Sequence, residues 1–145
     1  MARGDFRFWF DKRVRFAEVD AQAVVFNSRY LEYFDIGLTE YWRALGIYGD
    51  GGVQGGPEFF VARAELDFKA SMRLDELISI CVRCTRVGRT SMTFAFELHG
   101  AGGRDDLRAA GTLVYVHVDE LTGPPAPVPD WVVAKFEVFE GATLR

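Results

Sequence analysis

Histidine and cysteine, which supply many catalytic and metal-binding groups, are scarce in this chain of 145 residues, which has two of each. His99 and His117 stand well apart in stretches predicted as strands, and an isolated strand histidine is more often a surface or hydrogen-bonded core residue. Cys81 and Cys84 fall within an alternating stretch, where an offset of three residues puts their side chains on opposite faces of a strand. These observations disfavour Ser-His-Asp and Cys-His enzymes, histidine-rich metal sites and a redox or metal-binding Cys-x-x-Cys.

Several other signatures are absent. The sequence has no GxGxxG after a strand, GxxxxGK[ST], GxSxG or HExxH, the motifs of dinucleotide-binding, phosphate-binding, α/β-hydrolase and zinc-protease sites. No apolar run approaches the ~20 residues that cross a bilayer, and residues 1–5 show neither a signal-peptide nor a transit-peptide pattern. We therefore expect a cytoplasmic protein without a membrane span.

Charge of one sign does not dominate the chain. Seventeen Lys and Arg against 21 Asp and Glu give a net charge of −4, spread along the sequence rather than in blocks. This balance disfavours nonspecific binding of nucleic acid.

Apolar residues, in contrast, are plentiful at 49% of the composition. A domain of this length buries roughly 70% of the surface that its unfolded chain exposes, which excludes disorder as the main state and predicts one domain over residues 1–145. The chain has 13 Phe, 5 Tyr and 3 Trp, and such side chains are enriched in strands, interfaces and ligand pockets. We therefore expect a β-rich structure.

The first half of the sequence changes from a strand period to a helix period. Alternating aromatic residues over 6–16 predict a strand with one strongly aromatic face, and apolar residues at helical spacing predict a helix over 30–45. Asn27 or Ser28 can cap this helix, and Gly46 closes it.

The second half predicts strands again. A glycine-rich loop over 47–57 comes first. Further strands are predicted over 60–68, 77–87, 91–99 and 107–119. A short helix over 130–140 should turn Trp131, Ala134 and Phe136 inward. Five antiparallel strands around one long helix, the last four in a meander, make an α+β fold, and its exposed aromatic sheet face predicts a homo-oligomer, a dimer or a tetramer.

The loop before the long helix concentrates polar groups. Glu18 and Asp20 stand just upstream of the helix N-terminus, where free backbone N–H groups and the helix dipole favour negative charge. A purely structural interpretation is that Asp20 forms a turn and Glu18 points to water. The residues alone leave both interpretations open.

Several segments together resemble one known family. Residues 14–20, residues 24–33 and the amphipathic helix that ends at Leu45 and Gly46 resemble the hotdog-fold acyl-CoA thioesterases of the 4-hydroxybenzoyl-CoA thioesterase type. The resemblance is greatest to the branch associated with the Tol-Pal system. Further matching segments follow in order at 60–63, 73–80, 88–91 and 114–119, so that the resemblance covers about residues 11–137.

The resemblance implies hydrolysis of an acyl-CoA thioester. Asp20 matches the catalytic carboxylate, which acts as nucleophile or general base, and Asn27 matches the residue whose backbone N–H polarises the thioester carbonyl. No metal or cofactor is needed, because the thiolate is already a good leaving group. We expect Glu18 to act structurally or electrostatically.

The resemblance also implies where coenzyme A would bind. Arg89, Thr90 and Ser91 match the region along the pantetheine path, while Arg63 and Arg86 could hold phosphates through forked contacts. A solvated surface role is the alternative for each of these residues.

Two departures from the family pattern bear on function. Gln22 and Ala23 stand where many relatives have glycine, and alanine takes a positive φ less freely, so the loop could run differently. Asn27 stands where the related branch often has histidine, and Arg29 where many relatives have asparagine.

These departures leave an alternative function, a noncatalytic acyl-CoA-binding or scaffold domain. The hydratase branch of the same fold is disfavoured, because no histidine closely follows Asp20.

Overall fold

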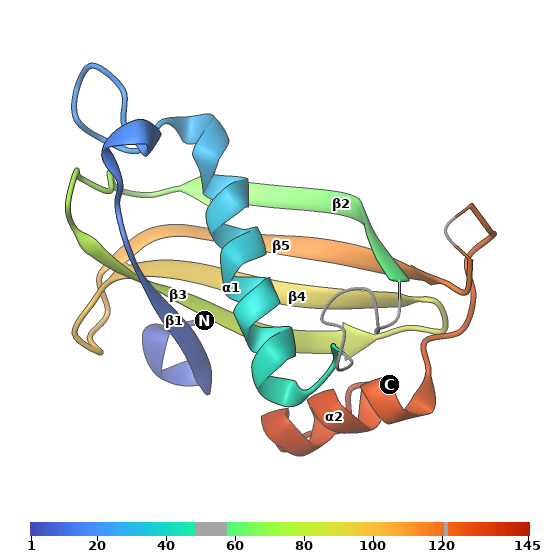
Figure 1. Cartoon of the computed structure of the whole chain (residues 1–145). Coiled ribbons are helices and arrows are strands. Elements are labelled where there is room, and N and C mark those ends of the chain that lie inside the picture. Colours follow the sequence, from blue (N-terminus) through green and yellow to red (C-terminus); the bar gives the residue numbers. More distant parts are fainter. Residues whose placement is uncertain (49–57, 121) are drawn as a thin grey trace. The chain divides into compact units, whose positions relative to one another are not determined.

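In the part of the chain that the structure describes, the regular elements are five strands, two α-helices and three short 3₁₀ turns (Figure 1). A computed structural model describes residues 1–48, 58–120 and 122–145. The elements in chain order are β1 (Phe8–Arg13), α1 (Tyr30–Leu45), β2 (Glu58–Phe68), β3 (Leu77–Val87), β4 (Ser91–Gly100), β5 (Leu107–Val118) and α2 (Asp130–Glu140). Most of the glycine-rich loop predicted over 47–57 lies outside the described residues, because only residues 47 and 48 are described.

The strands form one antiparallel sheet in the order β1-β3-β4-β5-β2. Strand β1 pairs with β3 from Phe8 opposite Val82 to Arg13 opposite Leu77. The α+β prediction is confirmed, but the predicted meander of the last four strands is wrong, because β2 lies beside β5 at the sheet edge. The backbone N–H groups of Lys69 and Ala70, just after β2, donate to the Arg108 carbonyl of β5, and a connection over 69–76 then leads back to β3.

The first strand is shorter than predicted. Strand β1 begins at Phe8, after a 3₁₀ turn over Arg3–Asp5, and a second 3₁₀ turn begins at Phe16. The predicted aromatic face, with Phe6 and Phe10 on it, is also mixed, because Phe6 is buried whereas Phe10 is exposed.

Helix α1 has the predicted bounds, but its start differs from the prediction. Asn27 and Ser28 lie inside a 3₁₀ turn over Asn27–Arg29 that runs directly into α1, and no side-chain hydrogen bond caps this turn. The predicted end is confirmed, because Gly46 has a φ of +75° and its N–H donates to the Arg43 carbonyl.

The described chain divides into two compact units, of which unit 1 comprises Met1–Tyr41, Leu66–Val82 and Phe96–Gly111. Phe34 of α1 stacks on Phe96 of β4 with a centroid separation of 4.7 Å. Gly37 is required for this packing, since a Cβ there would collide with Ile80 of β3. Tyr33 and Tyr41 complete a fully buried helix face.

Unit 2 comprises Trp42–Glu65, Arg83–Ala95 and Thr112–Arg145. Its core is aromatic: the Trp42 ring lies within 5.9 Å, centroid to centroid, of the rings of Tyr48, Phe59, Phe94 and Tyr115. Phe94 also contacts Phe136 of α2 at 5.4 Å. Unit 2 thus joins the last turn of α1 to α2 through one cluster of rings.

Helix α2 has the predicted bounds, but of the three residues predicted to point inward only Phe136 is buried. Trp131 is 48% exposed and Ala134 is also exposed, whereas Val132, Val133 and Phe136 are buried. The helix has apolar residues on two faces, and the face with the valines packs into the core of unit 2.

Among the described residues, no helix is long and apolar enough to cross a membrane.

Candidate active site

Backbone hydrogen bonds on both sides hold the loop between β1 and α1. Val19 bridges Val25 and Val24 bridges Arg73, and the Val25 N–H donates to the Met72 carbonyl at 2.8 Å. At the tip, the Ala23 N–H donates to the Asp20 carbonyl at 3.0 Å, which closes a tight turn. The loop therefore presents Asp20 from a fixed backbone.

Ala23 takes the positive φ that glycine would take in this turn. Its φ is +60°, a left-handed conformation that is unfavourable for a residue with a Cβ. The Ala23 carbonyl accepts the Leu74 N–H at 2.9 Å, so an external contact supports the conformation. The departure from the family pattern at this position has not opened the turn.

The Asp20 carboxylate is half-buried and only partly engaged. Its Oδ1 accepts the Gln22 N–H at 2.8 Å, which makes an Asx turn as the structural interpretation predicted. Across the described residues, Oδ2 has no hydrogen-bond donor. One carboxylate oxygen thus fixes the side chain, and the other is free to meet a water molecule or a substrate.

Asn27 begins the continuous helical segment that leads into α1. The N–H of Phe26, just before Asn27, donates to the Glu18 carbonyl at 2.9 Å and so belongs to the loop. The first N–H group of the helical segment is therefore that of Asn27. Such N–H groups have no intrahelical acceptor and carry the positive end of the helix dipole. Asp20 and Asn27 lie on the same connection, and no hydrogen bond joins their side chains.

Glu18 does not point to water, contrary to the structural interpretation from sequence. Its Oε1 accepts hydrogen bonds from Tyr33 Oη at 2.6 Å, from Lys12 Nζ at 2.8 Å and from the Arg15 N–H at 2.9 Å. Burial by itself raises the pKa of Glu18, but these three donors together hold the pKa below its ordinary value. Burial, and then the bond to Glu18, raises the pKa of Tyr33, which therefore remains a neutral donor.

Sequence reasoning missed this cluster of Lys12, Glu18 and Tyr33. Tyr33 belongs to the apolar face of α1, and its ring is fully buried. Its hydroxyl nevertheless reaches a carboxylate on the loop, and Lys12 Nζ lies 4.5 Å from the ring centroid. No sequence signal distinguishes this tyrosine from its neighbours on α1.

Three of the predicted coenzyme A residues converge in unit 2. Arg63 of β2, Arg86 of β3 and Ser91 of β4 line one hollow of about 370 Å³. The rest of its lining is Glu65, Thr93, Thr112 and Val114. The two threonines were missed, although Thr93 shares the alternating strand face of Ser91.

The two arginines of this hollow differ in availability. Arg63 pairs with Glu65, and both side chains are well exposed. Arg86 is exposed, and within the described part of the chain its guanidinium has no carboxylate partner. Arg86 is therefore the better placed of the two to receive an anion.

Arg89 and Thr90 lie outside the lining of this hollow. Both belong to the β3–β4 turn, where their carbonyls accept the N–H groups of Val128 at 2.9 Å and of His117 at 2.8 Å. The Arg89 backbone therefore holds the segment before α2, whereas the Thr90 backbone bonds to β5. The Arg89 side chain is exposed.

Both histidines are hydrogen-bonded core residues, as predicted. His99 Nδ1 accepts the Asp106 N–H at 3.0 Å, so Nε2 carries the proton that it donates to Glu97 Oε1 at 2.8 Å. His117 Nδ1 lies 3.2 Å from the Ala126 carbonyl.

Both cysteines of β3 are buried, and burial raises the pKa of each thiol to about 12. The described residues contain no cluster of three or more metal-ligating side chains.

Comparison with known proteins agrees with this architecture. The Thioesterase-like superfamily matches residues 14–136. The Acyl-CoA thioester hydrolase YbgC of Escherichia coli is 26% identical over 125 residues, which cover 86% of this chain and 92% of the relative.

Solved structures show the same fold. A thioesterase of Thermus thermophilus, crystallised with coenzyme A and Zn, is 25% identical, with a TM-score of 0.80 over 94% of this chain and 97% of that one. A predicted thioesterase of Bacillus stearothermophilus is 26% identical, with a TM-score of 0.79 over 91% of this chain and 95% of that one. The five-stranded sheet with its long helix and C-terminal helix is thus the expected hotdog fold, and the chain belongs to the thioesterase-like superfamily.

Proposed function

We propose that this thioesterase hydrolyses an acyl-CoA thioester to the free acid and coenzyme A, with Asp20 as the catalytic carboxylate. The observation that carries the proposal is the state of that carboxylate, in which the Gln22 N–H holds Oδ1 and Oδ2 has no donor among the described residues. A general base or nucleophile needs such a positioned but unsatisfied oxygen. The likeness to acyl-CoA thioester hydrolases supports the substrate class.

Two routes fit this geometry. As a general base, Asp20 takes a proton from water while the water oxygen bonds to the thioester carbon; as a nucleophile, it bonds to that carbon itself and forms a mixed anhydride. In both routes the C–S bond breaks, the electron pair leaves with the coenzyme A thiolate, and the thiolate then takes up a proton. Water cleaves the anhydride in the second route.

The helix N-terminus at Asn27 supplies the complementary charge. The carbonyl oxygen becomes negative as the carbon turns tetrahedral, and a backbone N–H aimed at it stabilises that charge in a low-dielectric site. We assign this role to the Asn27 N–H, and its amide side chain can hydrogen-bond the substrate as well. The proposed reaction uses no metal or cofactor.

Arg86 is proposed to receive a phosphate of coenzyme A, with Arg63, Ser91 and the threonines of the same hollow beside it. Arg89 and Thr90 are proposed to act along the pantetheine path. We also propose that the chain lies near the Tol-Pal-associated branch, because its matching segments resemble that branch most. Asn27 would then distinguish this chain from the members of that branch that have histidine at the same position.

We further propose a homo-oligomer, a dimer or a tetramer. The edge strands β1 and β2 expose large apolar side chains, among them Trp9 at 48%, Phe60 at 45% and Val61 at 54%. Light scattering at micromolar concentration tests this, and a monodisperse monomer of 16.3 kDa would contradict it.

A hydrolysis screen over a panel of acyl-CoA substrates, with release of free thiol as the readout, tests the proposed reaction. Asp20→Asn should retain substrate binding and lose turnover by ~10²- to 10⁴-fold, because the amide keeps the shape but not the basic oxygen. Asp119→Asn, which changes an exposed carboxylate at the end of β5, should stay near wild type.

Two further results make the test specific. Glu18→Gln should lower turnover less than tenfold, about 1.4 kcal/mol in the barrier, if Glu18 only supports the loop. The specific observation that favours a noncatalytic acyl-CoA-binding domain is the Asx turn at Asp20, which a purely structural residue would also form. Hydrolysis near the wild-type rate by folded Asp20→Asn would exclude Asp20 as the catalytic group, and no hydrolysis of any panel member by wild type would favour the binding domain.

A further inference from the structure

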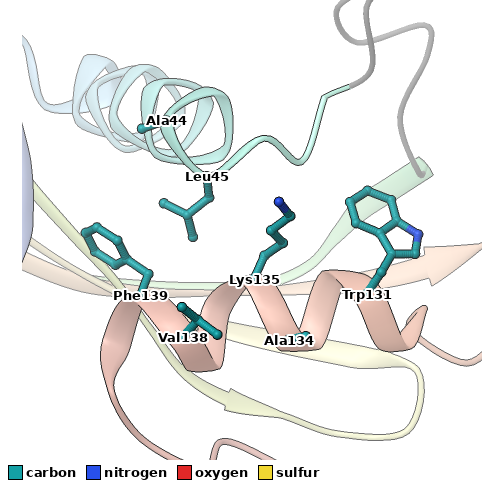
Figure 2. Close-up of a pocket in the computed structure, with 7 residues that line it drawn as sticks. All are labelled: Ala44, Leu45, Trp131, Ala134, Lys135, Val138 and Phe139. Atoms are coloured by element: carbon teal, nitrogen blue, oxygen red, sulfur yellow. The ribbon is translucent and has the colours of Figure 1, made fainter.

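A second hollow in unit 2 lies between the end of α1 and the exposed face of α2 (Figure 2). Its volume is about 530 Å³, which falls within the range of small-molecule sites, roughly 300–1,000 Å³. Ala44 and Leu45 come from α1, and Trp131, Ala134, Lys135, Val138 and Phe139 come from α2. The lining therefore consists of apolar side chains and a single ammonium group.

The apolar part of this lining is the face of α2 that its own unit does not cover. Trp131, Ala134 and Val138 follow one another at helical spacing, and Val138 is 83% exposed. The opposite face, with Val132 and Phe136, is buried. Covering the exposed face would remove a tryptophan ring and a valine from water, which is favourable in proportion to the apolar area.

The charge of the hollow comes from Lys135. Its Nζ points toward the end of α1 and is 3.8 Å from the place where a Cβ would lie on Gly46 (Figure 2). The carbonyl end of a helix attracts a cation, so this position is stabilised. No Asp or Glu among the described residues pairs with Lys135, which leaves its charge available to a ligand.

We propose that this hollow binds a monocarboxylate with a hydrocarbon tail, whose carboxylate pairs with Lys135 and whose tail lies along Leu45, Trp131 and Val138. The charge supports one anionic group, because a neutral ligand would leave the ammonium without a partner and a polyanion would find only one cation. Seven residues line the hollow, far fewer than the ~20–30 per side of a standard protein interface, which favours a small amphiphile over a protein. The site shares no residue with the proposed catalytic machinery, so it stands apart from the proposed function.

Titration of the full chain with dodecanoate, followed through the indole N–H resonance of Trp131, tests the proposal. A Trp131→Phe variant identifies that resonance. We expect a saturable shift, about two- to tenfold weaker binding in Lys135→Met, and equal binding in Lys69→Met, which removes an exposed lysine elsewhere. Dodecanol, which has the same tail and no charge, should bind wild type and Lys135→Met alike.

Ala134→Leu fills the hollow and keeps the charge, so it should abolish the shift. The proposal is overturned if dodecanoate binds Lys135→Met as tightly as wild type, or if folded Ala134→Leu still binds it. A fall in oligomer mass caused by Ala134→Leu would also overturn it, because a second copy of the chain would then cover the hollow. If Ala134→Leu does not fold, the comparison of Lys135→Met with Lys69→Met still decides.

Discussion

Tyr33 Oη donates a 2.6 Å hydrogen bond to Glu18 Oε1, which joins the buried face of α1 to the loop that carries Asp20. Tyr33→Phe should lower the free energy of unfolding by about 1–3 kcal/mol, because it leaves a half-buried carboxylate with one donor fewer. Chemical denaturation of the two proteins measures this difference. Turnover should fall with it, since the loop loses a contact, and full activity together with unchanged stability would contradict the role of this contact.

The conformation of Ala23 gives a second prediction. Ala23→Gly removes the cost of a left-handed alanine, of order 1–2 kcal/mol, but gives the unfolded chain more freedom, worth about 0.4–1 kcal/mol. We therefore expect the free energy of unfolding to rise by up to about 1.6 kcal/mol. Ala21→Gly is the control, since Ala21 lacks a positive φ and the change should only destabilise. Equal destabilisation by both glycines would contradict the prediction.

Acid should weaken unit 1 through Glu76. The Arg108 guanidinium donates to Glu76 Oε1 and Oε2, each at 2.8 Å, and holds the pKa of that carboxyl below its ordinary value of 4.5. A lowered folded-state pKa adds stability that is complete above the unfolded value and is lost as the pH falls through the folded value. Glu76→Gln should thus cost about 1–3 kcal/mol at pH 7, and the difference should shrink below pH 4.5.

Urea denaturation of wild type and Glu76→Gln between pH 7 and pH 3 measures this dependence. Glu32→Gln breaks the exposed pair with Arg29 and is the matched control, with an expected cost of about 0–1 kcal/mol. A constant difference between wild type and Glu76→Gln over the whole pH range would exclude the linkage.

Binding of coenzyme A should depend on salt through Arg86. Arg86→Ala should raise the KM for acyl-CoA about two- to tenfold at low salt with little change in kcat, because an exposed charge pair contributes modestly and is screened over ~8–10 Å. Glu65→Gln should lower KM, since it removes an anion from the hollow and releases Arg63. Arg89→Ala should have a smaller effect than Arg86→Ala, because Arg89 lies outside that lining. A KM that is constant across salt and in Arg86→Ala would refute the assignment.

The spacing of apolar residues located α1, β3 and α2 well, because each of these elements has a clear periodic pattern that is bounded by a glycine or a proline. It could not order the strands, since alternation shows which side chains share a face but not which strand is the neighbour, and β2 was therefore placed beside β3. For α2 it was right about Phe136 and wrong about Trp131 and Ala134, because both Trp131 and Val132 begin apolar stripes on this helix.

The candidate site was predictable in part. The resemblance placed Asp20 and Asn27 on one loop, and the structure adds which Asp20 oxygen is engaged. The contact between Tyr33 and Glu18 was not predictable, because it depends on how closely α1 approaches the sheet at Gly37. The convergence of Arg63 and Arg86 depends on strands that are distant in sequence, whereas Arg89 is near Arg86 in sequence and faces elsewhere.

The place of β2 beside β5 also fixes the order in which the sheet can assemble. The β3–β4 and β4–β5 pairs are hairpins that close short loops, and such local pairings form fastest. Strand β2 is synthesised before all of them, yet its partner is the last strand to leave the ribosome. During synthesis its exposed apolar residues Phe60, Val61 and Phe68 therefore have no neighbouring strand beside them, which makes β2 a segment of the nascent chain in need of protection from premature association.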